Sequence, residues 1–407
     1  MEKINILGVN ITNASQAEIL NRINEFFNSK KQHFIVTPNP EIILQATEKD
    51  EELHYILNHA DLALADGIAL KFAGWFYGKN IRRATGADIM VEILKLAQRE
   101  NRRVAIFNWQ GGLSAKTEIK RALADKFPGL KFFVQDIERS GPYYFEAVNK
   151  FAPDIIISGL GFPYQEKFIY YNLGQMPSAK LGLSVGGSFD YLTGKIQRAP
   201  KITRRLGLEW LWRLRKQPKR WRRIFGAIII FPFRFFIFFS ILRWFYRKNV
   251  ACLLYKKEQA YEKEKYKIII VERAGDKGHW QMPQGGTDRE SLPVSGAREL
   301  KEELNTEKFK PIAAFKNLFK YKFNKRFDND GLPTEYQPMK NQRGYKGQKQ
   351  SLFIAEFTGP DRDIKINFWE HSAWRWVDAE RLIESVHPLR REAAKIFMDK
   401  FWLTVKK

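Results

Sequence analysis

The sequence predicts an α/β N-terminal domain with a mostly parallel sheet, a basic and apolar helical linker, and a C-terminal α+β domain. Short apolar runs alternate with amphipathic stretches over the first 200 residues, as strands and helices do when they alternate along a chain. A segment rich in arginine and aromatic residues follows. Beyond it, a helix rich in glutamate is expected near residue 300. The candidate domain boundaries are 1–200, 201–248 and 249–407.

The length and composition agree with several domains. A chain of 407 residues can bury two or three sizeable cores. The single cysteine, Cys252, excludes an internal disulfide and a cysteine metal cluster and favours a reducing compartment, although a small buried apolar residue explains it best. The first residues, MEKINILGVNI, lack the basic and then apolar pattern of a signal peptide, so we expect the N-terminus to stay in the cytoplasm.

Five candidate strands in the first part each run directly into a polar or glycine-rich turn. They are residues 33–36, 62–65, 104–107, 154–158 and 181–185. In open α/β sheets ligands bind beyond the carboxyl ends of the strands, so we expect these turns to converge on one site of a Rossmann-like domain. No G-x-G-x-x-G motif follows the first strand, which argues against a dinucleotide oxidoreductase.

The formal net charge of +24 is concentrated near the middle of the chain. Between positions 195 and 223 there are twelve Lys or Arg residues and one acid, Glu209, and an apolar run follows at 224–248. Arg234 near the centre of that run would cost roughly 2.5–3.5 kcal/mol inside a bilayer, and Pro232 removes a helix hydrogen bond. Because both flanks are basic, we favour a re-entrant or interfacial anchor on an anionic membrane over a single crossing. Arginine with aromatics also suits nucleic acid, but the adjoining apolar run favours lipid.

The glutamate-rich segment, QMPQGGTDRESLPVSGARELKEE at 281–303, predicts a magnesium site. Glu299, Glu302 and Glu303 are spaced i, i+3, i+4, which places all three on one helix face. Crowded carboxylates are unfavourable unless a cation compensates them, and hard divalent cations prefer oxygen ligands. A solvated charged face is the alternative interpretation of the same pattern.

This segment resembles the Nudix hydrolase signature. The matching residues are the loop Gly285-Gly286, Glu290, and Arg298-Glu299-Leu300-Lys301-Glu302-Glu303. Residues 280–286, Gly347-Gln348-Lys349-Gln350, and Glu370 before Trp374-Arg375-Trp376 resemble the RNA pyrophosphohydrolase and dinucleoside polyphosphate hydrolase branch, over about residues 250–405. Two departures are present: the loop before Glu290 is two residues shorter than the family pattern, and Asn305 replaces a glycine.

The resemblance implies an α+β Nudix fold and a set of site residues. Glu299, Glu302, Glu303 and Glu370 would ligate Mg²⁺, with Glu302 also catalytic, and Arg298 would orient a glutamate. Substrate contacts are implied for Gly285, Gly286, Arg298 and Gln348. For Glu370, an ordinary loop acid is the alternative. The stretch 316–349, with the turn Asp328-Asn329-Asp330-Gly331, is either a substrate loop or an unrelated insertion.

The turns of the first part resemble the WecG/TagA/CpsF family of bacterial glycosyltransferases over about residues 3–223. The matching blocks are TPNPE at 37–41, ADG at 65–67, RATG at 83–86, GLGFPYQEK at 159–167, GGSFD at 186–190 and RAP at 198–200. The resemblance implies transfer of an N-acetylhexosamine, typically N-acetylmannosamine, from a UDP-sugar to a polyprenyl-diphosphate-linked sugar in cell-envelope polysaccharide synthesis. Because that acceptor sits in the membrane, the basic apolar segment would have a purpose.

The same resemblance suggests a role for individual residues. Asp66 is the candidate base that deprotonates the acceptor hydroxyl, with a turn-forming aspartate as the alternative. Thr37 and Asn39 would hydrogen-bond substrate, Arg83 would stabilise diphosphate charge, and Gln165 would donate to sugar or phosphate oxygens or cap a helix. Further candidate substrate contacts are Gly187, Asp190, Arg198, Arg213, Arg220 and Arg223, the last three to a lipid diphosphate or to headgroups. No D-x-D pair occurs in the matching blocks, so we expect no cofactor in this half.

Two hypotheses therefore follow. The first is a bifunctional enzyme at the cytoplasmic face of the cell membrane, a glycosyltransferase fused to a Mg²⁺-dependent pyrophosphohydrolase for nucleotide sugars or 5′-phosphorylated RNA. In the second, only the transferase is active, and the Nudix-like part is a nucleotide-binding or regulatory module.

Overall fold

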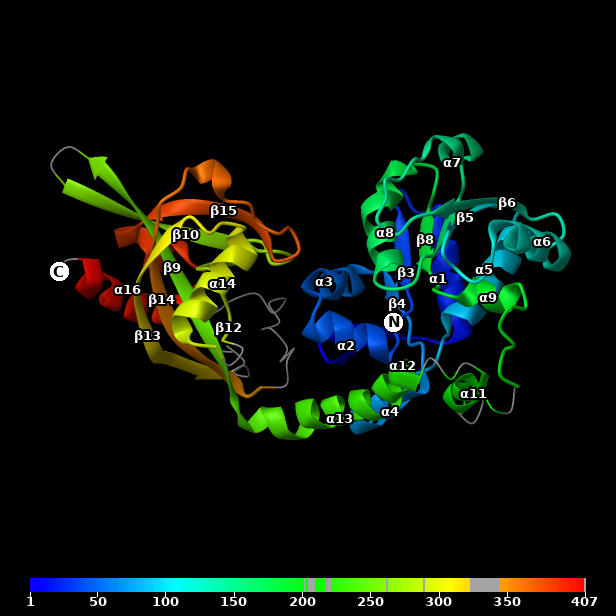
Figure 1. Cartoon of the computed structure of the whole chain (residues 1–407), viewed down its shortest axis with the longest axis horizontal. Coiled ribbons are helices and arrows are strands. Elements are labelled where there is room, and N and C mark those ends of the chain that lie inside the picture. The colour runs from blue at the N-terminus through cyan, green and yellow to red at the C-terminus, as the bar shows by residue number, and fades with distance from the viewer. Residues whose placement is uncertain are drawn as a thin grey trace. The chain divides into compact units, whose positions relative to one another are not determined.

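The chain forms two compact units, Met1–Ile237 and Phe238–Lys407, each with its own sheet (Figure 1). The computed structural model describes residues 1–200, 203, 209–216, 218, 221–260, 263–287, 290–322 and 345–405. The division between the units falls inside the apolar run that the sequence places in a separate linker of residues 201–248. The predicted turn at Asp328–Gly331 lies outside the described residues.

The N-terminal unit is built on a six-stranded parallel sheet in the order β4-β3-β8-β7-β5-β6. The strands are β3 (His33–Val36), β4 (Leu62–Ala63), β5 (Arg103–Trp109), β6 (Lys131–Ile137), β7 (Ile155–Gly159) and β8 (Leu181–Ser184). All five predicted strands are present, and the parallel α/β class is confirmed. The sequence analysis missed β6, because this edge strand is only partly buried and its apolar run is shorter than that of a central parallel strand.

Helices cover both faces of this sheet. On one face lie α1 (Gln16–Asn28), α5 (Gly86–Arg99) and α6 (Lys116–Lys126), which pack on Val104 and Ile106. The opposite face, with Ala105 and Phe107, is covered by α7 (Glu146–Phe151) and α8 (Tyr164–Asn172). This division follows from the alternation of side chains along a strand. The remaining elements are the hairpin β1 (Glu2–Ile6) and β2 (Val9–Asn13), α2 (Pro40–Glu48), α3 (Glu51–His59), α4 (Ile68–Phe76) and α9 (Ser188–Leu192).

Most of the described residues of the basic and apolar segment are helical, as predicted, and its last residues belong to strand β9 (Tyr246–Ala260). The segment contains α11 (Glu209–Lys216), α12 (Trp221–Phe225), a π-helical stretch (Gly226–Ile230) and α13 (Phe231–Phe236), followed by the short helical stretches Ile237–Ile241 and Leu242–Trp244. Phe231 and Phe235, one turn apart, are buried, and the Phe235 ring centroid lies 5.5 Å from that of Phe76. Arg234 forms an ion pair with Glu48 of α2 at 3.2 Å. Within the described part of the chain, no helix has both the length and the apolarity of a membrane span.

The C-terminal unit is a mixed sheet between helices. Its strands are β9 (Tyr246–Ala260), β10 (Lys263–Arg273), β11 (Trp280–Gln281), β12 (Gln284–Gly286), β13 (Phe309–Lys322), β14 (Gly347–Phe357) and β15 (His371–Asp378). The order is β11-β10-β9-β14-β13, and β12 pairs with β9 while β15 pairs with β10. Helix α14 (Leu292–Leu304) packs on one face of the sheet and α16 (Arg391–Val405) on the other, near the short α15 (Leu382–Ser385). The predicted α+β class of this part is confirmed.

Candidate active sites

The carboxyl ends of the parallel strands surround a cavity of about 540 Å³ in the N-terminal unit. Seven of the predicted site residues line it. They come from the turns after β3, β4 and β8, from the first turns of α8 and α9, and from the segment after α9: Thr37, Asn39, Asp66, Gln165, Gly187, Asp190 and Arg198. The strand ends therefore converge as expected for an open α/β sheet.

A second cavity of about 160 Å³ shares the residues Asn39, Asp66 and Glu209 with the first. Arg83 lines this smaller cavity. Most of its other walls are apolar and come from α2, the start of α4, the start of α11 and the helix after Trp221: Pro40, Ile68, Ala69, Trp210, Ile224, Ala227 and Ile228. Asp66 thus lies between a polar cavity and a largely apolar one.

A rigid turn holds Asp66 at this junction. Its backbone N–H donates to the Pro38 carbonyl at 3.0 Å, and its Oδ2 accepts from the Gly86 N–H at 3.4 Å. The next residue, Gly67, has φ +134°, and a Cβ there would lie 3.1 Å from Cδ of Pro40. Both the dihedral and the close approach require glycine, which explains the Asp-Gly pair in the sequence.

The Gln165 amide is held at both ends. Its Oε1 accepts from the Gly186 N–H at 2.5 Å, and its Nε2 donates to Oε1 of Glu166 at 2.7 Å. Glu166 is completely buried, and burial, with a smaller effect from Asp50, raises its pKa to about 7. The sequence analysis assigned a role to Gln165 but none to Glu166, so it missed this contact.

Carboxylates already engage the arginines of the predicted set. Arg83 forms an ion pair with Glu209, and Nη2 of Arg198 lies 2.7 Å from Oδ1 of Asp88. Thr37 and Asp190 also have internal partners: Thr37 donates to the Ser184 carbonyl at 3.1 Å, and Ser114 donates to Asp190 at 2.7 Å. Arg220 lies outside the described residues, as do the side chains of Arg213 and Arg223, so their roles stay predictions.

Several residues that line the larger cavity were missed from sequence. The Arg139 guanidinium lies 3.5 Å from the ring centroid of Trp109 and 5.1 Å from that of Tyr164, and its Nε donates to the Leu160 carbonyl at 2.7 Å. Arg139 follows β6, and because that strand was not predicted, Arg139 was not recognised as a residue at a strand end. Glu209 was visible only as the one acid in a basic run.

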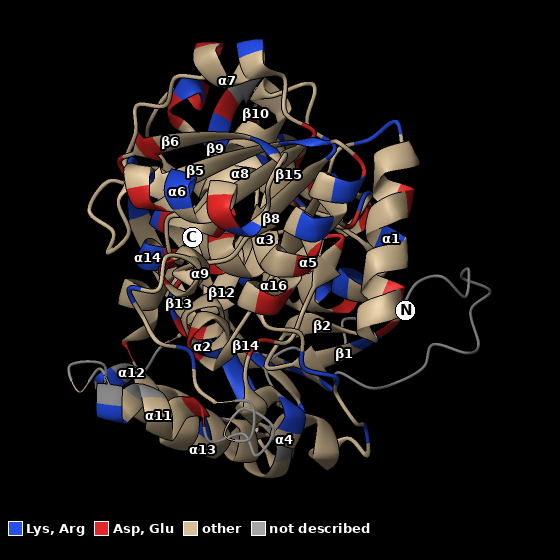
Figure 2. Ribbon diagram, turned by 90° about the vertical axis from the view of Figure 1, so that its right-hand side faces the viewer, with Lys and Arg blue, Asp and Glu red and all other residues tan. Residues whose placement is uncertain are grey.

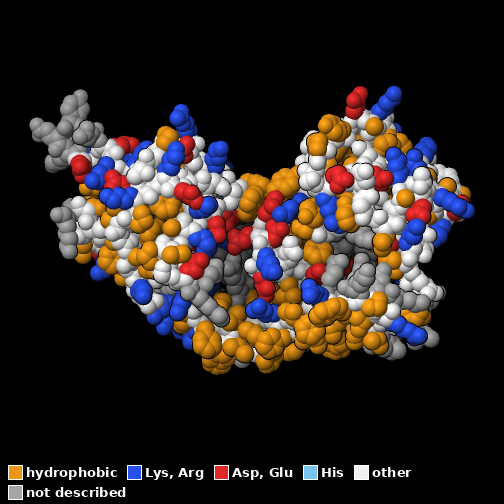
Figure 3. All heavy atoms as spheres, in the orientation of Figure 1, with side chains coloured by type: hydrophobic (Ala, Val, Ile, Leu, Met, Phe, Trp, Pro, Cys, Tyr) orange, Lys and Arg blue, Asp and Glu red, His pale blue; other side chains and the backbone are white. Residues whose placement is uncertain are grey.

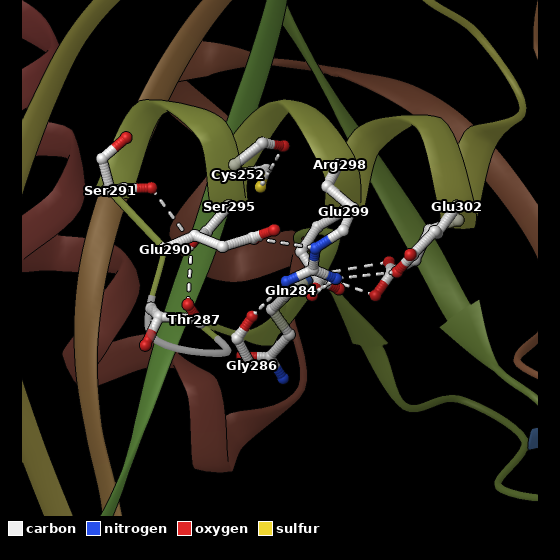
Figure 4. A network of polar contacts seen from close by, with 12 residues as sticks. Cys252, Gln284, Gly286, Thr287, Glu290, Ser291, Ser295, Arg298, Glu299 and Glu302 are labelled. Carbon is white, nitrogen blue, oxygen red and sulfur yellow. Dashed lines mark hydrogen bonds and ion pairs between the residues drawn. The ribbon is translucent and has the colours of Figure 1, made fainter. Parts of the chain in front are cut away.

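In the C-terminal unit, the acidic side chains gather around Arg298 (Figure 4). Its Nε lies 3.0 Å from Glu290, and its Nη1 lies 2.8 Å from Glu299 and 2.9 Å from Glu302. Nη2 donates to the Gly286 carbonyl at 2.8 Å. The guanidinium therefore ties the glycine loop to α14.

Two carboxylates of α14 are buried beside the loop. A Cβ on Gly285 would overlap the Glu299 carboxylate, so only glycine fits there. Burial, then Glu303, raises the pKa of Glu299 to about 8 despite the neighbouring Arg298. Glu303 accepts from the Gln284 N–H at 3.1 Å and lies 2.9 Å from Nε2 of His371, the residue after Glu370. On β14, Gln348 accepts from the Tyr321 hydroxyl at 2.6 Å.

The predicted ligands Glu299, Glu302, Glu303 and Glu370 do not form a ready metal cluster. Nowhere among the described residues are three or more His, Cys, Asp or Glu side chains placed to hold an ion. Arg298 draws two of these carboxylates to itself, and Glu303 is held by Gln284 and His371. The donor set nevertheless suits a hard divalent cation, because all four side chains are oxygen donors.

Comparisons with known proteins assign both halves. A model of the "Glycosyl transferase WecG/TagA/CpsF family" matches residues 4–245, and a NUDIX domain model matches residues 245–400. One relative, the N-acetylglucosaminyldiphosphoundecaprenol N-acetyl-beta-D-mannosaminyltransferase of Bacillus spizizenii, is 34% identical over 209 residues, 49% of this chain and 77% of that protein. The protein of the same name from Staphylococcus aureus strain MRSA252 is 32% identical over 241 residues, 57% of this chain and 91% of that protein.

Solved structures match the C-terminal part. A C. elegans Ap4A hydrolase binary complex is 18% identical with a TM-score of 0.27, covering 38% of this chain and 97% of its own. The NUDIX domain of Shewanella oneidensis NrtR complexed with ADP ribose is 15% identical with a TM-score of 0.25, covering 39% of this chain and 89% of its own. From the family match and the relatives of its first 245 residues, the chain belongs to the WecG/TagA/CpsF family of glycosyltransferases and carries a NUDIX domain behind it.

Proposed function

We propose that the N-terminal unit transfers an N-acetylhexosamine, N-acetylmannosamine by analogy with the relatives, from a UDP-sugar to a polyprenyl-diphosphate-linked sugar of cell-envelope polysaccharide synthesis. The observation that carries this proposal is the position of Asp66 in the walls of both cavities. The larger, polar cavity has the volume of a typical small-molecule site and suits a nucleotide sugar. The apolar walls of the smaller one suit an isoprenoid-linked acceptor.

The residues at this junction supply the parts of a direct displacement. Asp66 takes the proton of the acceptor hydroxyl while that oxygen attacks the anomeric carbon of the donor sugar. The bond from the anomeric carbon to the diphosphate oxygen breaks, and UDP leaves with both electrons of that bond. Arg83 and Arg198 offer guanidinium donors to diphosphate oxygens, and Gln165 donates to a sugar or phosphate oxygen. Asn39, Gly187 and Asp190 complete the donor-side wall.

The Asp66→Asn variant tests this assignment. We expect the turnover number for sugar transfer to fall by about 10²–10⁴, the usual contribution of a general base, while UDP still binds. Release of UDP in the presence of a soluble acceptor analogue measures the rate, and calorimetric titration measures UDP binding. Asp125→Asn, on the exposed surface of α6, is the matched control. Transfer at the wild-type rate by the Asp66 variant would remove the general-base role.

For the C-terminal unit, we infer Mg²⁺-dependent hydrolysis of a diphosphate bond in a nucleotide sugar or in 5′-phosphorylated RNA. Glu299, Glu302, Glu303 and Glu370 would hold the Mg²⁺, which supplies charge neutralisation of the polyphosphate and activation of water. With Mg²⁺ bound, Arg298 would keep its contacts with Gly286 and Glu290, and the metal would replace it as the partner of Glu299 and Glu302. Gln348 and the glycine loop would contact the substrate.

Phosphate release from a panel of nucleotide substrates tests this second activity, with the intact chain and with its Glu302→Gln variant. We expect Mg²⁺-dependent turnover that the Glu302 variant loses. The loop between Gly286 and Glu290, two residues short of the family pattern, favours the alternative of a nucleotide-binding or regulatory module. Nucleotide binding without turnover on the whole panel would establish that alternative.

A further inference from the structure

An apolar face runs along two helical segments of the N-terminal unit, and we call it the aromatic face. It consists of large side chains that are each 39–61% exposed: Phe72, Trp75 and Phe76 of α4, and Phe225, Ile229, Ile230, Phe233 and Phe236 of the helix 221–236. Figure 3 shows it as a nearly continuous hydrophobic band along the lower edge of this unit. Monomeric soluble proteins rarely expose so large a contiguous apolar patch unless it binds something.

The two segments are joined into one rigid support. Phe231 and Phe235 point into the domain and are only 1–2% exposed, and Phe235 packs edge-on against Phe76 and Tyr77. Arg234 adds an ion pair to Glu48 of α2 at 3.2 Å. Figures 1 and 2 both place α4 and α13 along the same edge of the unit. One side of the helix 221–236 is therefore used for packing, and the other side remains at the surface.

The two helical segments of the aromatic face carry basic residues and no acidic ones. The sequence has no Asp or Glu between Glu209 and Glu258, and none from Ile68 to Arg83. Basic side chains lie on or next to both segments, and three of them form ion pairs with glutamates of neighbouring elements, so the net charge of the rim comes mainly from the other two and from the basic run before Trp221. The five are Lys71, Lys79, Arg82, Arg222 and Arg234. Such a combination of apolar area and basic rim is complementary to the interface of a bilayer that contains anionic lipid.

We propose that the aromatic face lies flat in the interface of an anionic bilayer and that α4, part of the sugar-transfer domain itself, inserts Phe72 and Trp75. The lipid surface is thus assigned as the partner of this face. This role for docking rests on the proposed function. The same two helices line the smaller cavity, through Ile68 and Ala69 of α4 and Ile224 and Ile228 of the other helix. An isoprenoid acceptor can then reach Asp66 while its chain stays in the membrane.

Vesicle partitioning of the full chain tests the proposal. Phosphatidylcholine vesicles with phosphatidylglycerol are expected to bind it more strongly than phosphatidylcholine alone, and salt is expected to weaken the binding. The double variant Phe72→Ser, Trp75→Ser removes two exposed rings and is expected to weaken partitioning by about tenfold or more. Tyr144→Ser, which removes a 72% exposed ring elsewhere on the unit, is the matched control. Unchanged partitioning of the double variant, or no binding of the wild-type chain, would overturn the proposal.

Two further measurements separate this idea from its alternatives. Sedimentation velocity without lipid measures whether the aromatic face binds a second copy of the chain. If the wild-type chain is a dimer and the double variant is a monomer, the assignment of lipid as the partner is overturned. Sugar transfer by the double variant is expected to be normal with a short, water-soluble acceptor analogue and reduced when the acceptor is embedded in vesicles. Vesicle binding without any sugar transfer by the wild-type chain would refute the proposed function alone and support the docking surface.

Discussion

The buried Glu166 should make the stability of the N-terminal unit depend on pH, and Glu166→Gln should remove that dependence. Burial raises the pKa of this carboxyl to about 7 in the folded unit, against an ordinary value of 4.5. The folded state therefore holds the proton more tightly than the unfolded state. Stability is highest below pH 4.5 as far as this group is concerned, and it falls as the pH rises from there to about 7.

The size of the effect follows from the difference between the two pKa values. Since one pKa unit corresponds to about 1.4 kcal/mol, the wild-type unit should lose on the order of 3 kcal/mol over this window. For a unit of this size that is a shift of roughly 6–12 °C in the melting temperature. Glutamine has no such proton, and its carbonyl oxygen can still accept from Nε2 of Gln165, so the contact to Gly186 should survive.

Calorimetric unfolding of the intact chain at pH 5 and pH 8 measures the pH dependence of the stability of the N-terminal unit. We expect the first variant, Glu166→Gln, to gain stability over wild type at pH 8 and to show little gain at pH 5. Glu146→Gln, an exposed glutamate at the start of α7, should follow the wild-type profile at both values. An equal difference between Glu166→Gln and wild type at the two pH values would show that Glu166 carries no shifted proton.

Three further predictions concern other buried or engaged groups. Glu209→Gln leaves Arg83 without this ion pair, so titration should show several-fold tighter binding of UDP or pyrophosphate; unchanged affinity would mean that the pair does not compete with the ligand. Gly285→Ala puts a methyl group into the Glu299 carboxylate and should lower the unfolding free energy of the C-terminal unit by about 1–3 kcal/mol, with the N-terminal transition as internal control. Cys252 is completely buried and its thiol pKa is raised well above the ordinary value, so a disulfide reagent should label it only in denaturant; rapid labelling of the native chain would contradict the packing.

The sequence predicted the centre of the first fold better than its edge. Strands β7 and β8 are buried almost throughout and β3 at its carboxyl end, so their apolar runs and the turns behind them, which include Thr37 and Gly187, were visible in the sequence. Gln165 was found through the family resemblance. Strand β6 is only partly buried at the edge of the sheet and was not predicted. Arg139, which follows β6, was therefore not predicted as a site residue either. Roles that depend on tertiary contacts could not be predicted from local sequence. Glu166 is an example, because it accepts a hydrogen bond from Gln165, whose Oε1 in turn accepts from the Gly186 N–H.

In the C-terminal unit the spacing of the glutamates was sufficient to predict the helix and its charged face. It could not predict how the carboxylates distribute among partners, because that depends on Arg298 and on His371, which arrives from β15. Spacing along a helix fixes which side chains share a face. It does not fix whether a cation from another side chain or a metal ion neutralises them.

Three arginines that are predicted to contact substrate and whose side chains the structure describes are already paired with carboxylates: Arg83 with Glu209, Arg198 with Asp88, and Arg298 with three glutamates. Phosphate binding at these groups is then an exchange of one anion for another, and the net gain is the difference between two charge-assisted contacts. A monoanion gains little in such an exchange, whereas a diphosphate can engage several donors at once and replace the internal partner. The released carboxylate must also be compensated, by a divalent cation for Glu299 and Glu302, and by water or the surrounding basic residues for Glu209. The internal pairs therefore favour polyphosphate groups, which both proposed reactions share, over single phosphates.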